Sequence, residues 1–269
     1  MQSNINSLLL YEEIDQIAIL TLNRPKQQNA LSSELMKELL QKLNSIEDNK
    51  KIKVVTILSN GNNFCAGIDL NFLQTLLPRM EEVQDQMCNP PVGEDANWFQ
   101  RPCYIWRLLQ VPVIAAIDGI CIGAGLQLAL SADIRLASPT TRMSIMESKW
   151  GLIPDMGITQ VLPQLMRADQ AKELMMTGRM LDATASERVG LITRIVADPL
   201  SAAKDLAKEI MGLSPEAVNG SKVLIDKTWN LSPGLGLAVE AQMQSKIIGT
   251  PNQIESVVAR LEKRSANFK

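Results

Sequence analysis

The sequence predicts an α/β fold, with a layered core of strands and helices followed by a helical C-terminal region. Short runs rich in Val, Ile and Leu alternate with longer segments whose apolar residues recur at helical spacing. The chain has 269 residues, which is enough to bury a core without disulfides or metal. From about Pro215 to Lys269 the apolar positions follow helical spacing alone, which favours a separate layer of helices.

The N-terminal part is expected to begin with two strands and a helix. Residues 8–13 and 16–22 are rich in Leu, Ile and Tyr and are joined by a tight turn. The helix is capped by Ser32 or Ser33 and runs to about Asn44. Its apolar positions follow helical spacing at Leu35, Met36, Leu39, Leu40 and Leu43.

Further strands follow along the chain, and the connections between parallel ones should be right-handed crossovers. They are predicted at residues 54–59, 113–117, 134–137 and 143–145. A helix is expected to begin near Gly123. From Asp169 onward the pattern is mostly helical, with one short strand at residues 191–196.

The segment of residues 74–101 is less regular than the rest of the chain. It contains Pro78, Pro90, Pro91 and Gly93, with charged residues between them. A segment of this kind predicts a helix and a mobile loop near the entrance to a site, because long loops in compact domains are usually functional or disordered.

The composition excludes several classes of function. The formal net charge is −2, so no overall field attracts nucleic acid or an anionic membrane. The chain contains no histidine, which removes Ser-His-Asp triads, Cys-His pairs and histidine metal sites, and we expect no metal. Proton transfer near neutral pH must then fall to carboxylates, Lys, Tyr or Cys, and we favour carboxylates whose pKa is raised by burial.

The sequence shows no signal for export, membrane insertion or disulfides. Met1 to Asn6 lack a signal-peptide pattern, and the most apolar stretch, Val111 to Leu130, is interrupted by Asp118 and Gln127. We therefore expect a cytoplasmic protein. No C-x-x-C spacing occurs, so reduced, buried thiols are expected at Cys65, Cys88, Cys103 and Cys121.

Two glycine-containing turns follow predicted strands. The segments Phe64–Leu70 and Gly119–Gly125 contain small residues, among them Ala66, Gly67 and Ala124, which allow a ligand to approach the backbone closely. Backbone N–H groups at the start of a helix are free to bind an anionic oxygen. Neither turn fits the phosphate-loop or dinucleotide patterns, and a glycine-rich turn taken alone more often reflects simple packing.

Two carboxylates, Glu147 and Asp155, bracket an apolar turn. Such a pair could perform general acid–base chemistry. Taken alone, the pair also fits a surface glutamate and an aspartate that caps a helix.

Together, these three segments resemble the enoyl-CoA hydratase/isomerase (crotonase) superfamily. The resemblance extends over nearly the whole chain, and the matching pieces occur in the family's order. Further pieces that match are Asn23-Arg24-Pro25-Lys26, Asn29-Ala30-Leu31, Pro112-Val113-Ile114-Ala115-Ala116, Ser131-Ala132-Asp133-Ile134-Arg135, Thr177-Gly178-Arg179, Ala185, Gly190-Leu191 and Val196.

The resemblance implies a spiral core of ββα units over residues 1–200 and a helical oligomerisation region over residues 201–269. It further implies a homotrimer or homohexamer that acts on an acyl-CoA thioester. Coenzyme A would belong to the substrate, so no separate cofactor is expected. It also implies an oxyanion hole formed by the backbone N–H groups of Ile68 and Ala124.

Two other sets of residues have roles suggested by the resemblance and by their charge. Arg24 and Lys26 are candidates to meet the phosphates of coenzyme A, and Ala66 is a further candidate for coenzyme A binding. Both cations could equally be solvated loop charges. Gln127 could orient a polar group of the substrate.

The resemblance also bears on the reaction. Hydratases of the family usually carry two glutamates around a water, and this chain has Gln127 at the first position and Glu147 at the second. A neutral amide cannot act as a base. The pair Glu147 and Asp155 resembles Δ3,5-Δ2,4-dienoyl-CoA isomerases, although these enzymes typically carry a third acid where Gln127 stands. We therefore expect a dienoyl-CoA or enoyl-CoA isomerase of fatty acid metabolism.

Other activities within the resemblance stay open. A Δ3-Δ2-enoyl-CoA isomerase would need Glu147 alone. An enoyl-CoA hydratase, which is a lyase, and a catalytically weak acyl-CoA-binding protein are the main alternatives. Asp155 also matches the nucleophile of 4-chlorobenzoyl-CoA dehalogenases, which are expected to need a histidine that this chain lacks.

Overall fold

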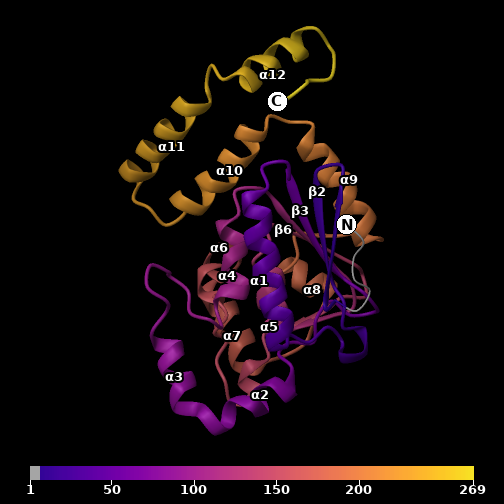
Figure 1. The fold of residues 1–269 in the computed structure, drawn as a ribbon, viewed down its shortest axis with the longest axis vertical. Coiled ribbons are helices and arrows are strands. Elements are labelled where there is room, and N and C mark those ends of the chain that lie inside the picture. Colours follow the sequence, from indigo (N-terminus) through magenta and orange to yellow (C-terminus); the bar gives the residue numbers. More distant parts are fainter. Residues whose placement is uncertain (1–6) are drawn as a thin grey trace.

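The structure is a computed structural model, and it describes residues 7–269 (Figure 1). The expected lack of a signal peptide concerns Met1 to Asn6, which lie outside the described residues. Within the described part of the chain, no helix is both long enough and apolar enough to cross a membrane.

The main sheet has six strands in the order β1-β2-β3-β4-β6-β9. β1 and β2 are antiparallel, and the other neighbours are parallel. Asp15 and Gln16 form the tight turn between β1 and β2 with φ values of 49° and 66°, as a two-residue hairpin turn requires. The strands are β1 (Leu9–Ile14), β2 (Ile17–Leu22), β3 (Val54–Ser59), β4 (Val113–Ile117), β6 (Ile134–Ala137) and β9 (Arg194–Ile195).

A second sheet has three strands, β5 (Ile120–Ile122), β7 (Arg142–Ser144) and β8 (Leu181–Asp182), in the order β5-β7-β8. Two isolated parallel β-bridges extend the pairing of this second sheet. One joins Cys65 to Cys121, and the other joins Leu31 to Ile68, so the segments that precede β5 in the chain also contribute to this layer. Each turn therefore adds a strand to the main sheet, a short strand or bridge to the second layer, and then a helix. This repeat confirms the predicted spiral of ββα units.

Helices cover the sheets and fill the space between the turns of the spiral (Figure 1). α1 begins where predicted, because the hydroxyl oxygen of its N-cap Ser32 accepts a hydrogen bond from the Leu35 N–H. It ends at Asp48, because its apolar face continues through the buried Ile46. The helices of the spiral are α1 (Ser33–Asp48), α2 (Leu70–Leu76), α3 (Met80–Cys88), α4 (Arg101–Leu108), α5 (Ala124–Leu130), α6 (Leu162–Leu165), α7 (Ala168–Thr177) and α8 (Ala183–Arg188). The 3-10 helices are η1 (Pro25–Gln27), η2 (Leu77–Arg79), η3 (Glu147–Trp150) and η4 (Ile158–Gln160).

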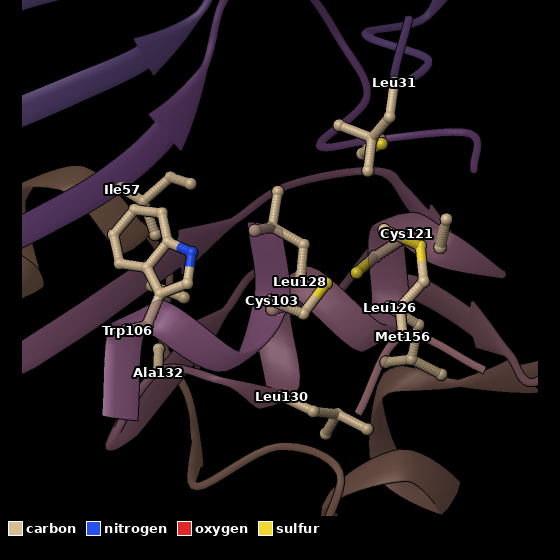
Figure 2. Close-up of a cluster of buried hydrophobic side chains, with 14 of the residues drawn as sticks. Leu31, Ile57, Cys103, Trp106, Cys121, Leu126, Leu128, Leu130, Ala132 and Met156 are labelled. Atoms are coloured by element: carbon tan, nitrogen blue, oxygen red, sulfur yellow. The ribbon is translucent and has the colours of Figure 1, made fainter. Parts of the chain in front are cut away.

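α5 lies at the centre of the core, and all seven of its residues are buried. Leu126, Leu128 and Leu130 of α5 belong to the main hydrophobic core together with Trp106 of α4, and Figure 2 labels all four side chains. A short helix buried on every side is fixed by its neighbours, so groups attached to it are held rigidly.

The segment of residues 74–101 contains more helix than predicted. α2 ends at Leu76, η2 follows directly, and α3 continues to Cys88 before an irregular connection reaches α4. The mobility expected for this connection stays a prediction.

The C-terminal helices form two groups. α9 (Pro199–Met211) packs Ala203 and Ala207 against the main sheet, so the predicted boundary at residue 201 cuts through a helix of the core. α10, α11 and α12 extend beyond the sheet (Figure 1), and α10 and α11 have no buried residue. These helices are α10 (Pro215–Thr228), α11 (Pro233–Ile247) and α12 (Pro251–Leu261).

Polar contacts attach α10 to the core. The Lys222 ammonium lies 2.9 Å from the Asp133 carboxylate and donates hydrogen bonds to the carbonyl oxygens of Trp106 and Val111. Its side chain is only 6% exposed, so these contacts satisfy a buried charge. These polar contacts fix α10 to the spiral.

All four cysteines are free thiols, as expected. Cys65, Cys103 and Cys121 are buried. The expectation of burial is wrong for Cys88, which is exposed because it lies at the end of the surface helix α3.

Candidate active site

The first candidate turn joins β3 to α2. Gly67 has a φ of 100°, a conformation that favours glycine, and its carbonyl oxygen accepts a hydrogen bond from the Leu31 N–H at 2.8 Å. The Asp69 N–H donates to the Leu31 carbonyl oxygen at 2.9 Å. Ile68 lies between these two bonds, and within residues 7–269 its own N–H donates to no acceptor.

The second candidate turn joins β5 to α5. Gly123 is the N-cap of α5, with a φ of 54°, and its N–H donates to the Ser144 carbonyl oxygen at 3.0 Å. Ala124 is the first residue of the helix, where an N–H has no intrahelical partner. In the described part of the chain the Ala124 N–H makes no hydrogen bond.

The two turns pack directly against each other. A Cβ atom at Gly125 would lie 2.5 Å from the Cys65 carbonyl oxygen, so only glycine allows this contact. A Cβ atom at Gly67 would lie 3.3 Å from the Ile122 carbonyl oxygen and 3.8 Å from the Ala124 nitrogen. Two unpaired N–H donors therefore lie on adjacent loops, an arrangement that can stabilise an oxygen anion if both donors converge on it.

Glu147 lies at the start of η3 and is 9% exposed. Its Oε1 atom accepts a hydrogen bond from the Gln127 side-chain amide at 2.7 Å. Its Oε2 atom is buried, with no hydrogen-bond partner among residues 7–269. Burial raises the pKa of this carboxyl group, and the nearby charge of Asp155 raises it further, whereas the bond from Gln127 lowers it.

Asp155 lies on the loop between η3 and η4. Its side chain is exposed at the surface of the single chain, yet surrounding protein removes enough water that desolvation raises the pKa of its carboxyl group. The same loop contributes Gly157 to the wall of a hollow of about 330 Å³, which is also lined by Tyr104 of α4. The Asp155 side chain is thus exposed, whereas the Glu147 side chain is buried.

The Gln127 side chain connects Glu147 to the loop that carries Asp155. It is 2% exposed and lies on the first turn of α5, close after Ala124. Its amide NH2 donates to Glu147, and its carbonyl oxygen accepts from the Met156 N–H at 2.8 Å. One buried side chain thus contacts Glu147 directly and the backbone next to Asp155.

The residues expected to bind coenzyme A occupy different environments. The Arg24 guanidinium forms an ion pair with Asp69 at 2.7 Å and donates to the Ala30 carbonyl oxygen. Lys26 is exposed, and Ala66 is partly buried on the first turn. Arg24 is therefore occupied by internal contacts, whereas the Lys26 ammonium faces solvent.

The sequence identified the two acids and the two turns but not several contacts between them. The pKa of the buried Cys103 thiol on α4 is raised, first by desolvation and then by the charge of Cys65. The charges of Asp155 and Glu147 raise it further, which places Cys103 near both acids. The bond from Met156 to Gln127 and the Arg24–Asp69 ion pair were also missed. These residues are far apart in the chain, and no local sequence pattern relates them.

Comparisons with known proteins identify relatives over the full length of the chain. Residues 12–269 match the family described as enoyl-CoA hydratase/isomerase. The chain is 35% identical to YngF of Bacillus subtilis (strain 168) over 267 residues, covering 98% of each chain. It is 33% identical to the mitochondrial methylglutaconyl-CoA hydratase of Mus musculus, covering 97% of this chain and 82% of that protein. The crystal structure of an enoyl-CoA hydratase from Bacillus anthracis superposes with a TM-score of 0.89 at 30% identity, covering 98% and 99% of the two chains.

The buried Glu147 carboxylate should reduce the stability of the wild type at neutral pH. Because its folded-state pKa is raised, the charged form is disfavoured by folding, and stability is lost as pH rises through that pKa. We expect Glu147→Gln to raise the melting temperature at pH 7. The gain should disappear at a pH below the ordinary glutamate pKa of about 4.3. Thermal unfolding at both pH values measures it, and equal melting temperatures at pH 7 would contradict the assigned environment.

Proposed function

The chain belongs to the enoyl-CoA hydratase/isomerase family, and we propose that it shifts a carbon–carbon double bond within an acyl-CoA thioester, as a dienoyl-CoA or enoyl-CoA isomerase of fatty acid metabolism. One observation carries the choice of isomerisation. Two carboxyl groups with raised pKa, Glu147 and Asp155, lie near a third position that is a neutral amide, Gln127, already hydrogen-bonded at both ends.

The reaction is a proton shift without net addition. One carboxylate removes a proton from the saturated carbon next to the thioester carbonyl, and the electron pair moves onto the carbonyl oxygen. The other carboxyl group then gives a proton to a more distant carbon as the electrons return. Desolvation moves the pKa of each group toward neutrality, which suits general acid–base catalysis.

The amide N–H groups of Ile68 and Ala124 form the proposed oxyanion hole. Both lack protein acceptors in the described residues, and they lie on adjacent turns. Two fixed donors stabilise negative charge on the thioester oxygen, by about 3–4 kcal/mol per donor in comparable sites. Ala124 lies at the start of α5, whose dipole acts in the same direction.

Hydration is the second candidate function, and the names of relatives favour it. The mouse relative is a methylglutaconyl-CoA hydratase, and the B. anthracis relative is an enoyl-CoA hydratase. Hydration needs a group that activates water, and the Gln127 amide cannot accept a proton from it. Glu147 alone could still activate water, so only the identity of the products distinguishes hydration from isomerisation. A catalytically weak acyl-CoA-binding protein would bind the thioester and form neither product.

Coenzyme A is proposed to meet Lys26 rather than Arg24. The Lys26 ammonium is exposed, whereas the Arg24 guanidinium is held by Asp69. The partly buried Ala66 stays a candidate contact on the adjacent turn. Lys26→Ala should raise KM about 2–5-fold, as expected for one exposed charge, with kcat unchanged. An unaltered KM would remove this role.

The C-terminal helices support a homotrimer or homohexamer. α10, α11 and α12 extend from the spiral with exposed apolar side chains, namely Ile225, Leu235, Leu237, Ile254, Val257 and Leu261. An apolar surface of this kind usually marks an interface. A solution mass equal to one 29.7 kDa chain would exclude it. The cytoplasmic location also stays a proposal, which cell fractionation tests.

The choice of reaction is tested with 3,5-dienoyl-CoA, 3-enoyl-CoA and 2-enoyl-CoA. We expect the wild type to isomerise at least one of the first two and to hydrate 2-enoyl-CoA little. Glu147→Gln and Asp155→Asn should each lower kcat for isomerisation by about 10²–10⁴-fold, because each removes one acid–base group.

The matched control is Asp169→Asn, an exposed aspartate of α7 outside the site, which should keep wild-type rates. Products are identified by absorbance and mass spectrometry, since hydration adds one water and isomerisation adds none. Rapid hydration of 2-enoyl-CoA by the wild type would establish the alternative. If Glu147→Gln alone lowers isomerisation, the reaction uses one acid and Asp155 has no part in it.

A further inference from the structure

We propose that Gln127 is a positioning residue that holds Glu147 and the Asp155 loop in one fixed arrangement, leaving Glu147 Oε2 as the oxygen that exchanges the substrate proton. The inference rests on the proposed function, because it concerns the same two acids. It assigns Gln127 a role through other residues instead of the direct substrate contact expected from the sequence.

The hydrogen bonds of Gln127 are directed into the protein. Its NH2 group donates to Glu147 Oε1 at 2.7 Å, and its carbonyl oxygen accepts from the Met156 N–H at 2.8 Å. The side chain is 2% exposed. An amide is the side chain that suits this position, because one end must donate to a carboxylate and the other must accept from an N–H.

The same bonds make the two Glu147 oxygens unequal. Oε1 is occupied by Gln127, whereas Oε2 is buried without a partner in the described residues. A buried carboxylate oxygen without a hydrogen bond lowers the stability of the fold. An oxygen of this kind is therefore more readily explained by a role in function than by a role in folding. A substrate C–H or O–H directed at Oε2 would supply the missing contact.

Gln127 also connects the acids to the oxyanion donor. Its backbone N–H donates to the Gly123 carbonyl oxygen in the first turn of α5, and the Ala124 N–H belongs to the same turn. α5 is buried on all sides and held rigidly by the core. One rigid helix therefore sets the distance between the point where charge develops and the groups that move protons.

The charged environment of Glu147 defines the expected pH dependence. The titratable groups that influence it or are influenced by it are Asp155 on the neighbouring loop and the Cys103 thiol of α4. The Gln127 bond stabilises the carboxylate form and so lowers its pKa. Removing that donor should move the acidic limb of the kcat–pH profile to higher pH, because deprotonation becomes harder.

Two substitutions separate positioning from simple packing. Gln127→Met keeps the length and volume of the side chain and removes both hydrogen bonds. Gln127→Glu keeps the acceptor for the Met156 N–H and replaces the donor by an acidic oxygen facing Glu147. Ser131→Ala is the matched control, because it removes a buried hydroxyl of the same region that donates to the backbone carbonyl of Gln127 rather than to its side chain.

We expect Gln127→Met to lower kcat by about 10²-fold, as for a catalytic group displaced by about 1 Å, with KM changed less than about 3-fold. Both Gln127 variants should shift the acidic limb to higher pH, and Ser131→Ala should leave both quantities unchanged. The rates are measured for whichever reaction the wild type performs, so a wild type that hydrates overturns the proposed function without affecting this test.

Titration of 13C-labelled glutamate by NMR gives a second readout that does not require turnover. The Glu147 pKa should rise in Gln127→Met relative to the wild type. If Gln127→Met does not fold, Gln127→Glu carries the same test, because it retains one of the two hydrogen bonds. An unchanged Glu147 pKa in either folded variant, or a wild-type kcat in Gln127→Met, would overturn the proposal.

Discussion

The close contact between the first turn of α5 and the backbone from Cys65 to Ile68 is the constraint on which the site depends. Gly125 permits it, since a Cβ atom there would lie 2.5 Å from the Cys65 carbonyl oxygen. The contact brings onto adjacent loops the N–H groups of Ile68 and Ala124, which have no acceptor within residues 7–269. Gln127 follows in the same turn and reaches Glu147, so the acids depend on the position of α5 as well.

Burial gives the site its chemical character. α5 carries no charged residue, and its surroundings are largely apolar. In such surroundings a carboxylate loses hydration, which raises its pKa toward the pH at which it exchanges protons readily. Among the described residues Glu147 Oε2 has no hydrogen-bond partner, and the bond from Gln127 limits the free-energy cost by stabilising the other oxygen. The proposed activity thus depends on an acid that is unfavourable for folding and held by its neighbours.

Local patterns predicted the elements that are long or strongly periodic. The strands at residues 54–59, 113–117 and 134–137 and the cap at Ser32 agree with the structure. β5 and β8 were not predicted, and β7, also three residues long, was predicted one residue late at 143–145, because such short runs give little periodic signal. The spiral came from the resemblance to a family, and the comparisons and the fold confirm it. The contacts of Gln127 and of Arg24 could not be predicted, because they join residues that only the tertiary fold brings together.

The central claim is that two backbone N–H groups polarise the carbonyl of a bound thioester. Infrared difference spectroscopy of an unreactive, saturated acyl-CoA with a 13C-labelled thioester carbonyl tests it most directly. Two short hydrogen bonds from Ile68 and Ala124 weaken the carbonyl double bond, so its stretching band should move to lower frequency on binding. A band that keeps its solution frequency while the ligand is fully bound would contradict the account.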